Sequence, residues 1–240
     1  MQDSKPQSAK TRQLTLAAVF AAIYVLLRAL PTFQMVGISS GYFTAGDFLL
    51  TTIALICGPW SGSLAVIVGT VAAYAVKPPI FFGLDFLPAL ANVSIAGFLI
   101  SGKRRVAVAM YVVVLATFLA SPYSLLFGSD AIPYTWLHLL AFAVLLSPVS
   151  GRIPQWLRVG GLKGTIGTAA LAFIGTMAQH LVGGILYEFV GFVGGLGPEH
   201  FKKLWSVIFW LYPAERIIIV LVSTVIALGV YRSFKAWRNK

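Results

Sequence analysis

The chain has 240 residues, of which 58% are hydrophobic and only 10% are charged, and its mean hydropathy is +0.87. Because soluble domains carry about 25% charged residues, this composition excludes an ordinary soluble domain and predicts a multi-pass protein of the cell membrane. The net charge of +11 lies in short basic clusters between apolar runs, a pattern that indicates membrane topology and argues against nucleic-acid binding. The expected fold is all-α, a polytopic membrane helix bundle.

The N-terminal segment is expected to be a disordered basic lead, residues 1–13, before an uncleaved first span at 14–30. From there a single transmembrane helical domain is predicted over 14–232. The first span carries two overlapping Ala-x-x-x-Ala pairs, which let a second helix approach closely in lipid. Plain helix propensity explains alanine equally well. The alanines are Ala17, Ala18, Ala21 and Ala22.

The stretch 41–76 predicts a tight transmembrane hairpin. Its two apolar runs, 48–57 and 64–76, are near the lower length limit for crossing a bilayer. They meet at the uncharged sequence GPWSG, residues 58–62, whose Gly and Pro end one helix and let the next begin. Asp47 lies near the open end, where it can cap the first helix.

Five further spans are predicted, at 86–101, 106–120, 134–146, 165–190 and 213–231. The segments 106–120 and 134–146 are short, and are interpreted as an added hairpin or as a tilted or re-entrant pair. Residues 194–211 are expected to form an interfacial connector, and Pro213 fits the first turn of the last helix. A basic tail follows at 233–240.

The basic residues divide unevenly between the two sides of this eight-span arrangement. Thirteen of the 18 Lys and Arg residues lie on the side that holds both termini, which predicts that both termini are cytoplasmic. The other five are Arg28, Lys77, Lys202, Lys203 and Arg216.

No catalytic or metal-binding constellation is visible, so we expect a protein that is not an enzyme and needs no cofactor or metal. Residues 97–103 fit the start of a phosphate-binding loop, but Arg104 stands where a Ser or Thr hydroxyl must bind magnesium. The three histidines, His138, His180 and His200, lack ligand spacing.

The span 165–190 is the most informative polar segment. Thr176, His180 and Tyr187 share one helical face, and Gln179 and Glu188 flank it. Polar groups inside a membrane are expensive, so they predict a binding site. The alternatives are hydrogen bonds between helices for His180 and Gln179, and an outer-interface position for Glu188.

Three further polar positions stay open. Asn92, near the middle of the span 86–101, can bind a ligand or join two helices by a hydrogen bond. Asp85 can cap the same helix or face a pocket. Glu215 and Arg216 are expected to serve the start of the last helix.

Four motifs in order resemble the substrate-binding S components of energy-coupling factor transporters. They are TRQLTL at 11–16 before the alanine pairs, GDF at 46–48, GPWSG at 58–62 and PAER at 213–216. The resemblance covers roughly residues 11–105 and 165–232. Such components have six spans, so the segment 106–146 departs from the family as an added hairpin.

The resemblance implies a membrane receptor for a vitamin or related micronutrient. It would dock on a transmembrane coupling subunit driven by two ABC ATPases, through the alanine face of the first span. The ligand would lie among Asp85, Asn92, Gln179, His180 and Glu188. An ion- or proton-coupled carrier is the main alternative, and a membrane enzyme acting on lipid or peptide is a third.

Overall fold

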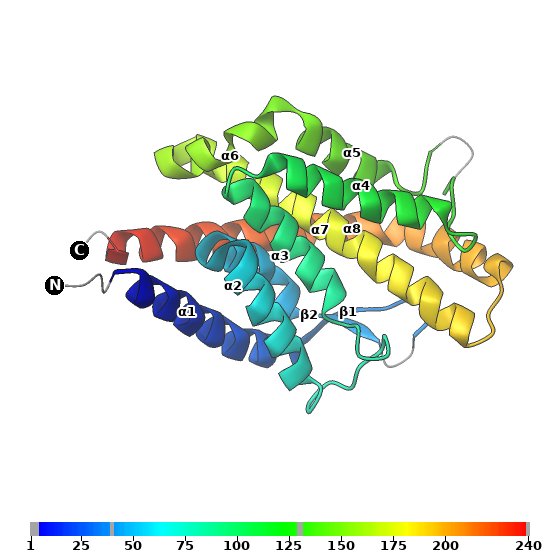
Figure 1. Ribbon diagram of the computed structural model, residues 1–240. Coiled ribbons are helices and arrows are strands. Elements are labelled where there is room, and N and C mark those ends of the chain that lie inside the picture. Colours follow the sequence, from blue (N-terminus) through cyan, green and yellow to red (C-terminus); the bar gives the residue numbers. More distant parts are fainter. Residues whose placement is uncertain (1–4, 39–40, 129–131, 239–240) are drawn as a thin grey trace.

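The computed structural model describes residues 5–38, 41–128 and 132–238, and this part of the chain is mostly helical (Figure 1). The predicted all-α class is confirmed. One small antiparallel pair of strands, β1 (Pro31–Gln34) and β2 (Tyr42–Thr44), interrupts the helices. The short 3-10 helix η1 (Ala45–Leu49) then leads into the bundle. The helices are α1 (Lys5–Arg28), α2 (Leu50–Ala73), α3 (Leu87–Ile100), α4 (Arg104–Ala120), α5 (Trp136–Leu146), α6 (Pro148–Val159), α7 (Gly161–Val193) and α8 (Pro198–Arg238).

Four helical segments of the described residues are long and apolar enough to cross a membrane: Lys10–Arg28, Ala45–Ala73, Gly161–Val193 and Pro198–Ala236. A fifth is added if α5 and α6, bent by 67° at their junction, count as one span. The count differs from the predicted eight for two reasons. The spans predicted at 48–57 and 64–76 fall within the single segment Ala45–Ala73, and apolar helices such as α3, with 14 residues, are shorter than the ~20 residues that a spanning helix needs.

The predicted fold-back at residues 58–62 is present within α2. Gly58 has φ 70° and ψ −171°, which breaks the helix and suits only glycine. A Cβ atom on Gly62 would lie 3.3 Å from the side chain of Ile53. In a straight helix these two residues, nine positions apart, would be separated by about 13.5 Å along the axis. Tyr24 of α1 likewise lies against both Gly46 and Gly69. The two limbs of α2 therefore lie side by side, and α1 contacts both η1, which leads into the first limb, and the second limb.

The predicted connector at 194–211 is wrong, because α8 already begins at Pro198. Pro213 lies inside this helix, and Glu215 and Arg216 are buried near its middle instead of in its first turn. The helix extends because one face of its first half is covered by the bundle. The buried residues at helical spacing are Phe201, Trp205, Ile208, Phe209 and Tyr212.

The predicted disordered lead also differs from the structure. α1 begins at Lys5, so residues 5–13 are helical, and residues 1–4 lie outside the described part. No glycine occurs between residues 5 and 30, and Pro6 falls in the first turn, where proline is tolerated. Of the tail at 233–240, the part up to Arg238 continues α8.

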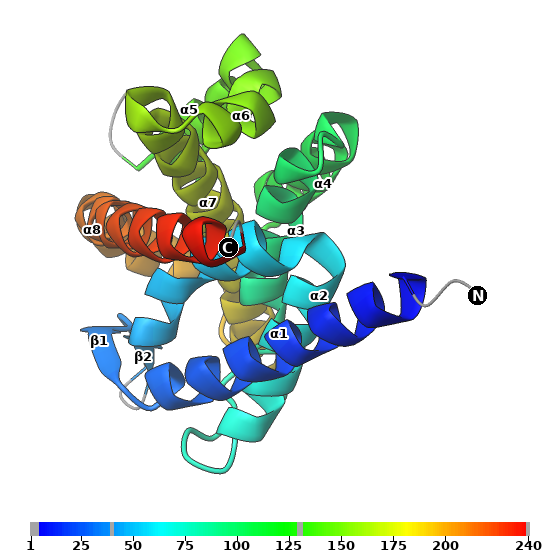
Figure 2. The ribbon, with the colours of Figure 1, turned by 90° about the vertical axis from the view of Figure 1, so that its left-hand side faces the viewer.

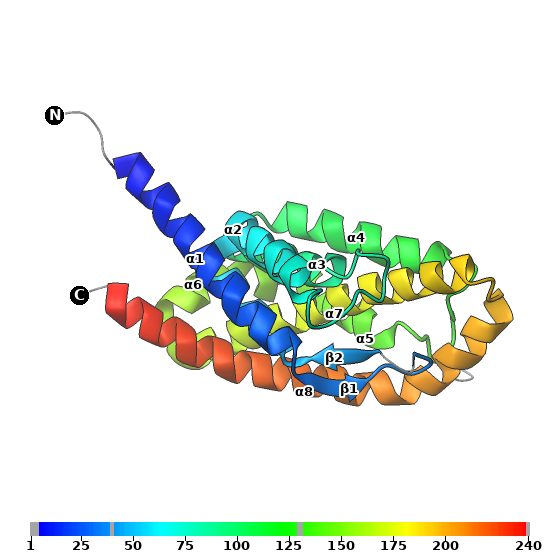
Figure 3. The same ribbon diagram turned by 90° about the horizontal axis from the view of Figure 1, so that it is seen from below.

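The chain ends lie at one end of the molecule, and β1 and β2 lie away from it (Figure 1). α7 runs through the bundle and contacts α3, α4, α5, α6 and α8. α1 packs mainly on α2 and diverges from the other helices toward its N-terminus (Figures 2 and 3). The segment predicted as an added hairpin forms α4 and α5, which cover one side of α7.

Candidate functional site

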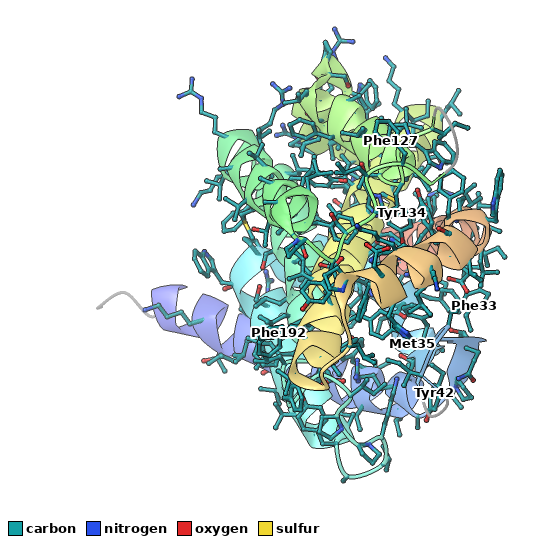
Figure 4. All side chains as sticks on the ribbon, turned by 90° about the vertical axis from the view of Figure 1, so that its right-hand side faces the viewer. Phe33, Met35, Tyr42, Phe127, Tyr134 and Phe192 are labelled. Carbon is teal, nitrogen blue, oxygen red and sulfur yellow. The ribbon has the colours of Figure 1, made fainter. Side chains whose placement is uncertain are left out.

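A cavity lies where the C-terminal end of α1, the β1–β2 hairpin, η1, the loop before α3, α7 and α8 converge. It offers a volume of about 110 Å³ to the centres of water-sized molecules, several times the ~15 Å³ that one water needs. Figure 4 looks at this end of the molecule and labels Met35 and Tyr42, which line the cavity from the hairpin. The polar and charged lining residues include Arg28, Asp47, Lys77, Asp85, Gln179, His180, Tyr187, Glu215 and Arg216.

Gln179 sits at the centre of a buried hydrogen-bond chain. Its Nε2 donates to Asp47 Oδ1 at 2.6 Å, and its Oε1 accepts from Asn92 Nδ2 at 2.9 Å. The chain joins α7 to η1 and to α3. Gln179 and Asp47 line the cavity, whereas Asn92 lies behind them, only 1% exposed. Of the two roles left open for Asn92, the structure shows the inter-helix hydrogen bond.

Asp85 faces the cavity and does not cap α3, whose N-cap residue is Phe86. Its two carboxylate oxygens accept from the backbone N–H groups of Ile80 and Phe81, at 2.9 and 3.0 Å. The carboxylate therefore fixes the loop that closes this side of the cavity. Asp47 also accepts a 3.4 Å hydrogen bond from the backbone N–H of Thr44, so the cap predicted for the first helix of the hairpin falls on η1, whereas the N-cap residue of α2 is Leu49.

The predicted polar face of α7 is partly brought to the cavity. His180 and Tyr187 line it, together with Gly183 and Gly184. The Tyr187 hydroxyl donates to the Val36 carbonyl at 2.9 Å, which ties α7 to the hairpin. Thr176 and Glu188 are buried elsewhere, and Glu188 Oε1 accepts from Trp205 Nε1 at 3.1 Å.

His180 is held from behind by the added helix pair. Its Nδ1 lies 2.9 Å from His138 Nε2 of α5, so one ring donates to the other. The two rings are nearly parallel, with centroids 5.1 Å apart, as expected for rings joined edge to edge by this hydrogen bond, and Tyr212 of α8 stacks on both. The Tyr111 hydroxyl of α4 donates to the His138 carbonyl. α4 and α5 therefore orient a residue of the cavity wall without lining the cavity themselves.

Five charged residues of the cavity wall were not predicted as site residues: Arg28, Asp47, Lys77, Glu215 and Arg216. The sequence did contain a signal for three of them. Arg28, Lys77 and Arg216 are among the five basic residues that the predicted topology assigns to the side opposite the termini. Basic residues on that side are disfavoured, so each has a reason to be examined for function.

The four alanines of α1 divide into two faces. Ala17 and Ala21 are buried, with the Ala21 carbonyl packed close to Gly69 of α2, so they are used within the chain. Ala18 and Ala22 are exposed. Exposed apolar side chains of the same helix accompany them: Leu14, Val19, Ile23 and Leu26.

We expect Gln179→Leu to lower stability by about 3 kcal/mol, because it leaves the Asn92 amide and the Asp47 carboxylate without a buried partner. Thermal unfolding in detergent measures the effect. Gln155→Leu, at an exposed position of α6, is the matched control and should change stability by less than about 0.5 kcal/mol. Equal melting temperatures for the two variants would show that the buried chain is not needed.

A comparison of the chain with protein-family models, with curated proteins and with solved structures found no match.

Proposed function

We propose that the chain is a membrane-embedded, high-affinity binding subunit for uptake of a vitamin or related micronutrient. The observation that carries the proposal is the cavity, which places charged, amide and aromatic groups inside an otherwise apolar helical protein. Binding sites for small molecules are concave and largely apolar, with a few convergent polar groups that fix the ligand. Arg28, Gln179 and His180 are such groups here.

The proposed topology has both termini in the cytoplasm of a cell-membrane protein, with six core spans plus the α4–α5 hairpin. The excess of basic residues on the terminal side supports it. The cavity lies at the C-terminal end of α1, away from both termini (Figure 1). In this orientation the cavity opens toward the outside, where a nutrient is captured.

The proposed partners are a transmembrane coupling subunit and two ABC ATPases. Support comes from the motifs that resemble S components and from the exposed face of α1. On that face Ala18 and Ala22 are small enough to let a second helix approach. Ala17 and Ala21 are buried within the chain, and Ala21 packs against Gly69 of α2, so docking through the alanines is confined to the exposed pair.

The second candidate function is an ion- or proton-coupled transporter. One observation favours it: Glu215 is buried near the middle of α8, where an ionisable residue is expensive and marks function by default. Its pairing with Arg216 at 3.2 Å is compatible with either function.

The test is to purify the full chain alone in detergent and identify co-purified small molecules by mass spectrometry. A tightly held vitamin-like compound, retained by the chain and weakened by His180→Ala and Gln179→Ala, is the expected result. Reconstitution into liposomes separates the two functions. Accumulation of solute by the chain alone under an ion gradient would reject the binding-subunit proposal, and unchanged affinity in both alanine variants would reject the site.

A further inference from the structure

Two cationic side chains line the cavity without a carboxylate partner. Arg28 ends α1 and Lys77 follows α2, and each is only 7% exposed. The ion pairs within 4 Å among the described residues are Lys202–Glu199 and Arg216–Glu215, so neither cation takes part in one. Arg28 Nε is buried with no hydrogen-bond partner, and its Nη1 makes only a long 3.5 Å contact with the Tyr24 hydroxyl.

The neighbouring acids are already engaged by other groups. Asp85 accepts two backbone N–H groups, and Asp47 accepts one backbone N–H and the Gln179 amide. Lys77 Nζ donates to the Tyr42 carbonyl and lies 4.3 Å from the centre of the Tyr42 ring, which leaves further N–H donors. The unused hydrogen-bonding groups of Arg28 and Lys77 are therefore N–H donors, which require an acceptor.

A guanidinium group has five N–H donors in a planar fork and no acceptor, and a carboxylate fits that fork with two hydrogen bonds. A buried cation without a counter-charge is costly, so an anion placed beside it is strongly favoured. Aromatic side chains line the same space: Tyr42, Phe43, Phe81 and Trp205. They offer faces and edges to a flat ring.

We infer that the cavity takes a small aromatic or heteroaromatic carboxylate whose carboxylate group binds between Arg28 and Lys77. The inference rests on the proposed function for the identity of the site and adds the chemical class of the ligand. Arg28 precedes the β1–β2 hairpin in the sequence, and Lys77 follows it, after α2. Only the folded protein therefore presents both cations to one ligand.

The test measures thermal unfolding of the full detergent-solubilised chain with matched probes: indole-3-acetate against indole-3-acetamide and tryptamine, and nicotinate against nicotinamide. At least one acid is expected to raise the melting temperature, and its amide and amine to do so far less. Arg28→Gln should weaken binding of that acid by about tenfold or more, as expected for loss of a hydrogen bond to a charged group. Lys202→Gln, in the exposed pair with Glu199, is the control and should bind as the unmodified chain does.

The inference is overturned if no acid stabilises the protein more than its amide, or if tryptamine is the preferred probe. It is also overturned if Arg28→Gln binds the acid normally. Should Arg28→Gln fail to fold, Lys77→Gln takes its place with the same expectation. The outcome is separable from the proposed function: a co-purified ligand without an anionic group rejects the inference alone, whereas gradient-driven transport of a bound acid rejects the binding-subunit role alone.

The pH dependence of binding tests independently whether Lys77 binds the carboxylate. Lys77 lies after the candidate span that ends at Ala73, and burial and the nearby charge of Arg28 lower its pKa to about 8, partly offset by Asp47 and Asp85. Above that pKa the amine becomes neutral, so affinity for the acid probe should fall as pH rises from 7 to 9.5. In Lys77→Gln the affinity should be lower and nearly independent of pH over this range. A pH dependence that persists in Lys77→Gln would remove Lys77 from the anion site.

Discussion

Gly97→Ala is expected to destabilise the protein by about 3 kcal/mol, at the upper end of the range for overpacking a core. A Cβ atom at this position of α3 would lie 2.6 Å from both the Cα and the backbone N of Pro59. These are backbone atoms of the α2 turn, so no side chain can rotate away to make room. Either α3 or the turn must move, and both limbs of α2 would lose contact with α3.

The control for this variant is Gly229→Ala. Gly229 also lies inside a helix, α8, but nothing lies within 4 Å of the position its Cβ would take. Alanine is the better helix former, so this variant should be neutral or more stable by about 0.5–1 kcal/mol. The measurement is the melting temperature of both purified variants in the same detergent. If Gly97→Ala melted with or above Gly229→Ala, the close contact between α3 and the α2 turn would be wrong.

Arg216→Met is expected to cost about 3–5 kcal/mol, because it leaves the Glu215 carboxylate buried without its partner. The guanidinium lies 3.2 Å from Glu215 and 4.2 Å above the ring of Phe43, and the residue is 1% exposed. Its removal therefore breaks an ion pair and a contact between α8 and the β1–β2 hairpin.

The double variant Arg216→Met with Glu215→Gln separates these two effects. Because it removes both buried charges, it should regain much of the stability lost in the single variant. Lys202→Met, which breaks the exposed pair with Glu199, should cost less than about 1 kcal/mol. If the single and double variants melted at the same temperature, the loss would come from packing on Phe43 and not from the unpaired charge.

The positions left open by the sequence were decided by partners far away in the chain. Asn92 and Gln179 are 87 residues apart, and Gln179 and Asp47 are 132 residues apart, yet they form one hydrogen-bond chain. Local reasoning identified Asn92 and Gln179 as polar residues in apolar surroundings, and Asp47 as a helix cap. It could not separate a ligand contact from an inter-helix bond, because both uses place the same residue types in the same apolar background.

The charged wall of the cavity was missed for a related reason. Glu215 and Arg216 follow Pro213, and a proline usually marks a helix start or break. In the structure, the face formed by Phe201, Trp205 and Tyr212 is buried, and α8 continues without a break past Pro213. The gain from burying these aromatic side chains outweighs the lost backbone hydrogen bond, a balance that depends on the helices packed against this face.

The sequence by itself determined the helical class, the membrane-protein composition, the fold-back at residues 58–62 and the polar face of α7. Each rests on local information: apolar length, Gly and Pro chemistry and helical spacing. Only the tertiary structure decided that Arg28, Lys77, Asp85, His180 and Arg216 share one cavity, and that α4 and α5 support it through His138. These relations depend on which helices touch, and that is fixed by complementary packing across the whole bundle, which no single segment encodes.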